Sequence, residues 1–315
     1  MNQLLAASST WAMPTIDYRE IAPILIVLGM AVVAVLVEAF VPRKSRREIQ
    51  VVITFATLLG ALIMVISEAS VRGLFAQTAI AIDGPGLFMQ GTILVLALMC
   101  ALLVAEGRVD PAGDGFAARA NALPGSVDER EFTKRGWLTT EVWSLYLFSV
   151  GGMLMFVVAN DLLIMFVALE VMSLPLYLLA GIARRRRLLS QEAAMKYFLL
   201  GAFSSGFFLY GSALLYGFSG SIEFGAIAEA TSAKAGPNGL LVAGIALVSV
   251  GLLFKVAAVP ALLAMVWLAA VPAVASELTV RDAPLRSSMQ LLPSEPIVTR
   301  PPPAAVPLFN FTVPA

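Results

Sequence analysis

Three ionisable residues stand inside long apolar runs of the sequence, where a charge needs a physical reason. Glu170 lies in NDLLIMFVALEVMSLPLYLLAGI, Lys196 in AAMKYFLLGAFSSGFFLYGSALLYG and Lys255 in VSVGLLFKVAAVP. A charged group at the centre of a membrane helix costs roughly 2.5–3.5 kcal/mol on insertion scales, so such groups face the bundle interior and often mark a proton or ion path. One acid and two bases in successive apolar runs therefore favour a proton relay.

A purely structural role is the alternative for each of these residues. A static buried ion pair can fix helix packing, and a lysine near a helix end can extend its ammonium group to the headgroups. Glu192 lies four residues before Lys196, so the two can pair along one helix face. Pro175 follows Glu170 by five residues, and Pro260 follows Lys255 by five. Each proline is expected to disturb the helix beside its charge, where freed backbone groups can take part in ion handling.

The elements that must position these residues are membrane helices. Hydrophobic residues make up 59% of the 315-residue chain and charged residues 13%, and the mean hydropathy is +0.87, which is typical of a polytopic membrane protein. Because about 20 residues cross the hydrocarbon core, the sequence predicts an all-α membrane bundle. Its seven expected spans are residues 21–41, 49–67, 86–105, 138–158, 162–182, 193–217 and 239–268. Small residues that should allow close helix packing are Gly151, Gly152, Gly201, Ser204, Ser205 and Gly206.

Basic residues concentrate in alternate connections between the expected spans. They are Arg43, Lys44, Arg46 and Arg47 after the first span, Arg108, Arg119, Arg130, Lys134 and Arg135 after the third, and Arg184, Arg185, Arg186 and Arg187 after the fifth. The positive-inside rule places these connections in the cytoplasm and the N-terminal segment, residues 1–20, outside the cell membrane. Glu38 is expected to reach the interface or Arg43.

Composition excludes several other functions. The formal net charge is zero, which argues against a basic nucleic-acid binder, so partners are expected in the lipid bilayer. The chain has no histidine and a single cysteine, Cys100, and therefore lacks the residues of a zinc or iron–sulfur site. Cys100 is expected to be a small core residue. No strand-to-helix phosphate loop is present in the sequence, so no nucleotide cofactor is expected in this chain.

The apolar runs that hold the three charges resemble a known family. LEVMSLPLYLLAG, SQEAAMKYFLLGAFSSGFFLYGSALLYGFSGS and GLLFKVAAVP are similar to the N-type antiporter-like membrane subunits of bacterial NADH-quinone oxidoreductase, respiratory complex I. The resemblance is dense from about Thr139 to Pro260. It implies a non-redox subunit of a translocase that couples NADH oxidation by quinone to proton pumping. Other membrane subunits of the complex would be its partners, and the NADH, FMN, iron–sulfur and quinone sites would lie in partner subunits of the complex.

The resemblance also implies a role for each charge. Lys255 corresponds to the lysine on the broken seventh helix and would carry the proton, Glu170 would modulate it as an opposing charge, and Lys196 would pass protons from the cytoplasmic side. Desolvation and an opposing charge act in opposite directions on a buried lysine, so moving the carboxylate would switch proton uptake to release. Two alternatives remain: a subunit of a multisubunit sodium/proton antiporter, and an inactive membrane scaffold.

The family pattern stops after Pro260. The transmembrane domain is expected to end near residue 275, and residues 276–315 contain eight prolines and no long apolar run, which predicts a disordered tail. Two explanations are open: a genuinely shortened subunit, or a frame shift near codon 260 that makes the last residues out-of-frame translation. The Ala- and Pro-rich composition favours the second, and sequencing of the DNA and transcript across this region would decide.

Overall fold

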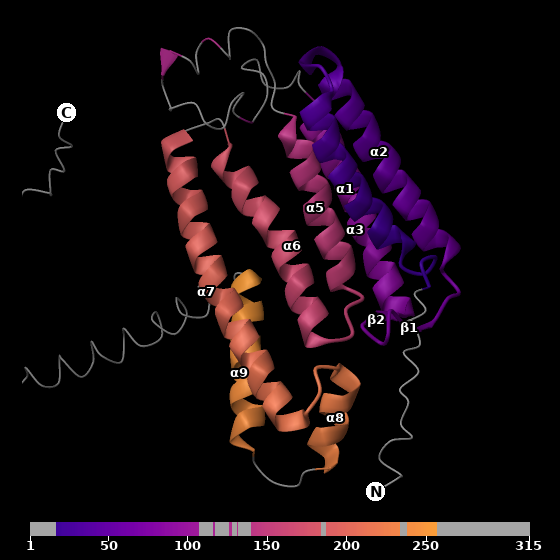
Figure 1. Cartoon of the computed structure of the whole chain (residues 1–315), viewed down its shortest axis with the longest axis vertical. Coiled ribbons are helices and arrows are strands. Elements are labelled where there is room, and N and C mark those ends of the chain that lie inside the picture. The colour runs from indigo at the N-terminus through magenta and orange to yellow at the C-terminus, as the bar shows by residue number, and fades with distance from the viewer. Residues whose placement is uncertain are drawn as a thin grey trace, which may run out of the picture. The chain divides into compact units, whose positions relative to one another are not determined.

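The computed structural model describes residues 17–106, 116, 126–127, 131, 140–183, 187–233 and 238–256. Its helices are α1 (Ala22–Phe40), α2 (Arg43–Ser67), α3 (Gly84–Ala105), α5 (Glu141–Phe156), α6 (Leu162–Gly181), α7 (Arg187–Ser219), α8 (Phe224–Ala233) and α9 (Gly239–Lys255) (Figure 1). Within these described ranges, five helices are long and apolar enough to cross a membrane, namely α1, α2, α3, α6 and α7, and α5 and α9 are shorter apolar helices. The predicted all-α membrane fold is confirmed, and each expected span overlaps a helix, the last one over residues 239–255 only. The part of the last span beyond residue 256, and the tail, lie outside the described residues.

Short polar residues and one proline set where several helices begin. The carboxylate of Asp83 accepts the backbone N–H of Gly86 at 2.7 Å, and that of Asp161 accepts the N–H of Ile164 at 2.6 Å. These are N-caps, which satisfy backbone donors that the first turn leaves free. Pro42 separates α1 from α2, because the residue before a proline avoids helical geometry and Val41 is extended. The helices that carry the candidate site are thus delimited by local sequence.

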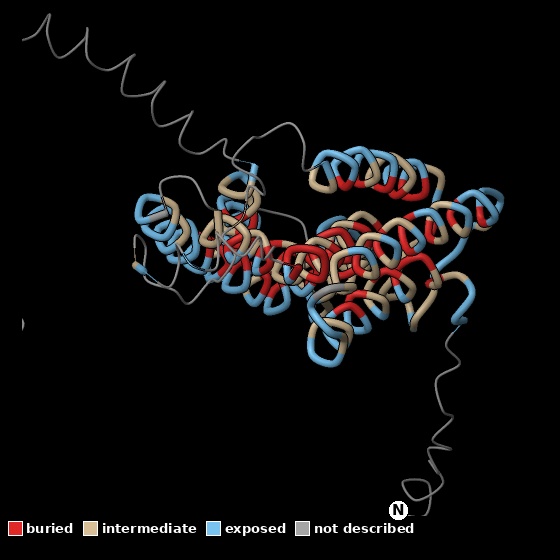
Figure 2. Tube along the Cα trace, turned by 90° about the horizontal axis from the view of Figure 1, so that it is seen from above, coloured by how far each residue is buried: buried red, intermediate tan, exposed pale blue. Residues whose placement is uncertain are grey.

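Buried positions lie along the helix faces that meet, whereas the opposite faces are exposed (Figure 2). Among the described residues, α1, α2, α3 and α5 contribute to one hydrophobic cluster, and α6, α7 and α9 to another. Helix α5 packs against both α1 and α6. A Cβ atom on Gly151 would lie 2.4 Å from Leu28 Cδ2 of α1, and one on Gly152 would lie 2.4 Å from the backbone nitrogen of Met172 in α6. Both glycines therefore permit the close packing that was predicted for them.

The segment between α2 and α3 folds as a β-hairpin. Strands β1 (Gly73–Phe75) and β2 (Ile80–Ile82) pair in antiparallel fashion. The hairpin docks on the connection between α5 and α6, where the N–H of Ala81 donates to the carbonyl of Val158 at 2.9 Å. Thr78 at its tip donates to Glu223, just before α8, at 2.5 Å. The hairpin therefore joins the first and second halves of the described bundle.

One single-residue expectation is corrected. Cys100 is exposed rather than buried, because the buried residues of α3, which include Leu94, Ala97 and Ala101, follow a different face of the helix. Glu38 contacts Arg46 and Thr140: its two carboxylate oxygens accept hydrogen bonds from Arg46 and from Thr140 next to α5, both at 2.6 Å. Glu38 consequently ties α1 to α2 and to the start of α5.

Candidate functional site

Glu170 and Lys255, two of the three predicted site residues, lie together inside the second half of the bundle. The Lys255 Nζ atom is 3.9 Å from Glu170 Oε1, and the two side chains are 9% and 26% exposed, respectively. Glu170 follows Leu162, the first residue of α6, by eight positions, which places it roughly 12 Å along the helix and near the middle of a bilayer core. Lys255 is the last residue of α9, where the partial negative charge of the helix end favours a cation.

Two hydroxyl groups on α6 complete the surroundings of the lysine. Lys255 Nζ donates to Ser173 Oγ at 3.0 Å and to the Tyr177 hydroxyl at 2.9 Å. Ser173 also donates to the carbonyl of Leu169 at 2.6 Å, which fixes its own orientation. Glu170, Ser173 and Tyr177 recur at spacings of three and four residues, so they share one face of α6. This face supplies the two hydroxyl groups and the carboxylate that contact the ammonium group.

Helix α7 supports the same site from its other side. Ser205 donates a hydrogen bond to Glu170 Oε1, the oxygen that faces Lys255. The preceding residue, Ser204, donates to the carbonyl of Gly251 in α9 at 2.9 Å. Adjacent serines on α7 thus hold the acid-bearing helix and the lysine-bearing helix in register. Both serines were singled out in the sequence as packing residues, and their hydrogen bonds add a role to that prediction.

Tyr177 is held between α6 and α7 by close aromatic packing. Its side chain is buried, and its ring meets the Tyr197 ring edge to face, with centroids 4.5 Å apart. A Cβ atom on Gly201 would lie only 2.0 Å from the Tyr177 hydroxyl oxygen, so glycine is required for this approach. Sequence reasoning missed Tyr177 and Ser173, although their spacing from Glu170 along one helix face was a usable signal.

Lys196, the third predicted site residue, is not brought to this cluster. Its Nζ lies 2.5 Å from Glu192 Oε1, one turn earlier in α7, and the two side chains are 68% and 58% exposed. The expected pairing of these residues along one helix face is therefore present. The neighbouring Tyr197 points to Tyr177, and consecutive helix residues project in directions about 100° apart, so Lys196 faces elsewhere.

A buried carboxyl that is separate from the cluster follows the end of α2. Glu68 is 1% exposed, and neither of its carboxylate oxygens has a hydrogen-bond partner among the described residues. Burial is the main cause that raises the pKa of Glu68 to about 7; Glu20 raises it further and Arg19 lowers it. The folded chain thus favours the neutral carboxyl at this position below about pH 7.

Glu68 should therefore make the stability of the fold depend on pH. Because its folded-state pKa lies above the ordinary value of 4.5, the favourable contribution is complete below pH 4.5 and is lost as the pH rises through 7, by at most about 3 kcal/mol. We expect the midpoint of thermal unfolding in detergent to fall between pH 5 and pH 9 in the wild type, and to fall less in Glu68→Gln. Parallel pH profiles for the two proteins would contradict this assignment.

Comparison with known proteins finds similar sequences over most of the chain. Residues 159–279 match the family described as "NADH:quinone oxidoreductase/Mrp antiporter, TM". NADH-quinone oxidoreductase subunit N of Nocardioides sp. is 54% identical over 257 residues, which are 78% of this chain and 48% of that protein. The corresponding subunits of Acidothermus cellulolyticus and Rhodococcus opacus are 55% and 51% identical and are covered over 48% and 51% of their lengths. The chain thus spans about half the length of these relatives.

Two solved structures have a fold similar to that of this chain. A chain of respiratory complex I from Thermus thermophilus, solved with bound aureothin, superposes with a TM-score of 0.54 and 30% sequence identity, over 74% of this chain and 43% of that one. A chain of an archaeal membrane-bound sulfane sulfur reductase has a TM-score of 0.52 and 20% identity over the same shares, which shows a common fold only. The helix arrangement around Glu170 and Lys255 therefore belongs to an antiporter-like membrane fold.

Proposed function

Because residues 159–279 match the NADH:quinone oxidoreductase/Mrp antiporter family, we propose that this chain takes part in proton translocation within a membrane-bound NADH-quinone oxidoreductase. One observation carries the proposal: a lysine and a carboxylate lie 3.9 Å apart, mostly buried, between the membrane-spanning helix α6 and the shorter apolar helix α9. Such a pair is costly in hydrocarbon and is rare where it has no function. The identity to subunit N proteins supports the choice of enzyme.

The proposed mechanism assigns the proton to Lys255. Its ammonium form is stabilised by Glu170 and by the hydroxyl groups of Ser173 and Tyr177, which accept its hydrogen bonds. Movement of the Glu170 carboxylate away from the lysine would leave a buried cation with neutral partners only, and would favour proton release. Ser205 donates a hydrogen bond to the carboxylate oxygen, and this bond must break before the carboxylate can move.

Lys196 is proposed to deliver protons from the cytoplasmic side, a role that rests on the family resemblance. Among the described residues its ionic partner is Glu192, and both side chains of this pair are exposed. The nearest link to the Lys255 cluster is its neighbour Tyr197, which contacts Tyr177. Proton delivery would therefore need water or another side chain between Lys196 and the cluster.

The remaining parts of the proposal concern the surroundings of the chain. We place it in the cell membrane with its basic connections in the cytoplasm, next to other membrane subunits of the same complex. The redox groups, which are FMN and iron–sulfur clusters, and the NADH and quinone sites would belong to other subunits of the complex. This chain would contribute proton-carrying side chains and no redox centre.

Replacement of Lys255 by alanine tests the proposed function. In inverted membrane vesicles from cells that carry Lys255→Ala, NADH-driven acidification should be lost, because the group that binds the proton is absent. NADH oxidation with an artificial electron acceptor should continue, since no redox group is removed. Acidification is followed by quenching of a pH-sensitive dye.

Two results would overturn the assignment. Unchanged NADH-driven acidification in Lys255→Ala would remove the lysine from the proton path. Sodium-dependent proton exchange that needs no NADH oxidation, and that disappears in Lys255→Ala, would instead identify a sodium/proton antiporter subunit. The second result would leave Lys255 as the proton-carrying residue and would replace the assigned NADH-quinone oxidoreductase by a sodium/proton antiporter.

A further inference from the structure

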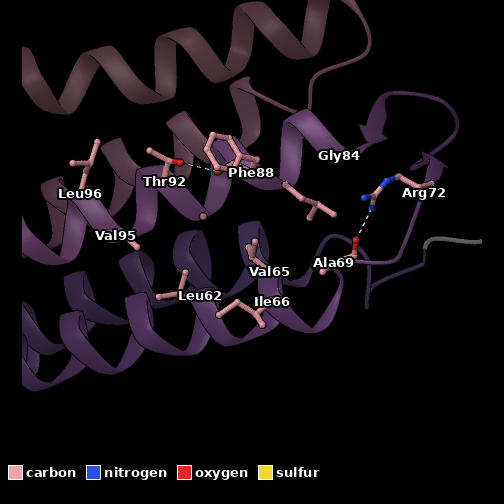
Figure 3. A pocket seen from close by; sticks show the side chains of 12 residues that line it. Leu62, Val65, Ile66, Ala69, Arg72, Gly84, Phe88, Thr92, Val95 and Leu96 are labelled. Carbon is pink, nitrogen blue, oxygen red and sulfur yellow. Dashed lines mark hydrogen bonds between the residues drawn. The ribbon is translucent and has the colours of Figure 1, made fainter.

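A groove between α2 and α3 lies apart from the proton-carrying cluster. It has a volume of about 570 Å³, and side chains from both helices line it, from Leu62 and Leu96 at one end to Arg72 at the other (Figure 3). Its walls are almost entirely carbon, and Ile66, Phe88 and Leu96 are 65%, 73% and 62% exposed. An exposed apolar groove of this size on a membrane helix pair is suited to a flexible hydrocarbon chain.

Apart from Arg72, the polar groups along the groove are already satisfied by the backbone. The hydroxyl group of Thr92 donates to the carbonyl of Phe88 at 2.9 Å, so it presents no unpaired donor to a ligand. Asp83, near the mouth, uses one carboxylate oxygen to cap α3 through the N–H of Gly86. The interior of the groove therefore offers dispersion contacts and little else.

Arg72 gives the mouth of the groove a fixed positive charge. Its Nη1 donates to the carbonyls of Ala69 at 2.9 Å and Val71 at 2.5 Å, which anchors the guanidinium group over Gly84. Across the described ranges of the chain, no carboxylate lies within salt-bridge distance of Arg72, and its Nε and Nη2 make no hydrogen bond. A planar guanidinium group with unused donors is well matched to a phosphate.

The length of the groove fits one leaflet of a bilayer. The lining residues of α3 run from Gly84 to Leu96, which is roughly 18 Å at the rise of an α-helix. Half of a hydrocarbon core is roughly 15 Å. The charged mouth follows the end of α2, where the apolar helix gives way to the hairpin, so the groove extends from the membrane boundary to about the midplane.

From these features we propose that the groove binds one acyl chain of an anionic glycerophospholipid, with the lipid phosphate held by Arg72. The apolar walls take the chain, the depth of one leaflet matches its length, and the uncompensated guanidinium group selects a negative headgroup. A transmembrane helix of a partner subunit fits less well, because it would need contacts across the full membrane thickness. The inference does not depend on the proposed proton translocation.

Photo-crosslinking tests this proposal on the full chain in its native membrane. Cells are supplied with phosphatidylglycerol that carries a diazirine on one acyl chain, membranes are irradiated, and the chain is purified with its partners for peptide mass spectrometry. Labelling is expected on peptides that contain residues 84–96. Arg72→Gln should reduce this labelling roughly fivefold, the loss expected for one cation near the membrane surface. Phosphatidylcholine with the same label should give weaker labelling of the wild type.

A second variant separates the acyl-chain contact from the headgroup contact. A Cβ atom on Gly91 would meet only Val65 Cγ1 at 3.9 Å, so Gly91→Leu can be accommodated and fills the groove. Gly91→Leu should remove the labelling of residues 84–96 even though Arg72 is unchanged. The matched control is Gly60→Leu on α2. A Cβ atom on Gly60 meets nothing within 4 Å, and Gly60 does not line the groove. This control should keep wild-type labelling.

Three outcomes would overturn the proposal. The first is an absence of lipid labelling on α2 and α3 in the wild type. The second is labelling that neither Arg72→Gln nor Gly91→Leu reduces, which would indicate general contact with the bilayer. The third is a crosslink from a photoreactive residue at position 91 to another membrane protein, which would show that a partner helix fills the groove.

Discussion

We expect Glu170→Gln to lower NADH-driven proton translocation by at least about tenfold, which corresponds to 1.4 kcal/mol. Lys255 is 9% exposed, and Glu170, at 3.9 Å, is the acidic partner that the described residues give it. Two unit charges at 4 Å interact by about 4 kcal/mol at an effective dielectric constant of 20, and partial exposure of the glutamate reduces this value. Glutamine can still accept the hydrogen bond of Ser205, so the variant removes the charge with little change in packing. Dye quenching in inverted vesicles measures the rate.

The control for Glu170→Gln is Glu229→Gln, which makes the same chemical change at an exposed position on α8. Its translocation rate should equal that of the wild type. Equal amounts of the assembled complex and equal NADH oxidation with an artificial acceptor must be shown for both variants, so that a loss of assembly is not mistaken for a loss of pumping. If Glu170→Gln translocates protons at the wild-type rate, the ion pair is structural.

The charged centre of the site could be predicted from the sequence because a charge inside an apolar run is conspicuous. Glu170 and Lys255 stand out in this way, and the structure brings them together. Ser173 and Tyr177 do not stand out, since isolated hydroxyl groups are common in membrane helices and can bond to their own backbone. Their importance appears only when α9 places Lys255 against that face of α6.

Lys196 also stands in an apolar run, but the run does not predict which face of α7 this residue occupies. The face of α7 that contacts α6 and α9 includes Tyr197, Gly201, Ser204, Gly211 and Leu215, at spacings near three and four residues. Lys196 is one position away from this register, so it lies on another face of the helix. Hydropathy locates a residue along a helix but gives no direction around it unless the neighbouring helices are known. Its proposed role stays a prediction.

The membrane helices could be predicted because hydropathy and length are strong signals, whereas the smaller elements could not. Strands β1 and β2 have three residues each, too few for an alternating pattern to be recognised. Their turn places Ala76, Gln77 and Thr78 at positive φ angles of 52°, 57° and 69°, without the glycine or asparagine that usually marks such a turn. Helix α8 has no buried residue and lacks the length of a span.

We expect Gly211→Ala to destabilise the chain by about 1–3 kcal/mol, the usual cost of overpacking. A Cβ atom at this position would lie 2.7 Å from the backbone nitrogen of Val248 and 2.8 Å from the carbonyl oxygen of Gly244. Backbone atoms cannot rotate away as a side chain can, so α7 and α9 must separate. Because Lys255 is at the end of α9, the separation should also weaken its contacts with α6. Thermal unfolding in detergent and the translocation rate both report the effect.

The same substitution at Gly206 isolates the effect of packing from that of helix propensity. Gly206 is also in α7, and a Cβ atom there meets nothing within 4 Å. Replacement of glycine by alanine in a helix interior normally stabilises by up to about 1 kcal/mol, so Gly206→Ala should unfold at or above the wild-type temperature. If Gly211→Ala and Gly206→Ala unfold at the same temperature, the close approach of α7 and α9 is not what holds Lys255 in place. A lower midpoint for Gly211→Ala alone, with reduced translocation, would link the packing of these two helices to the position of the proton-carrying lysine.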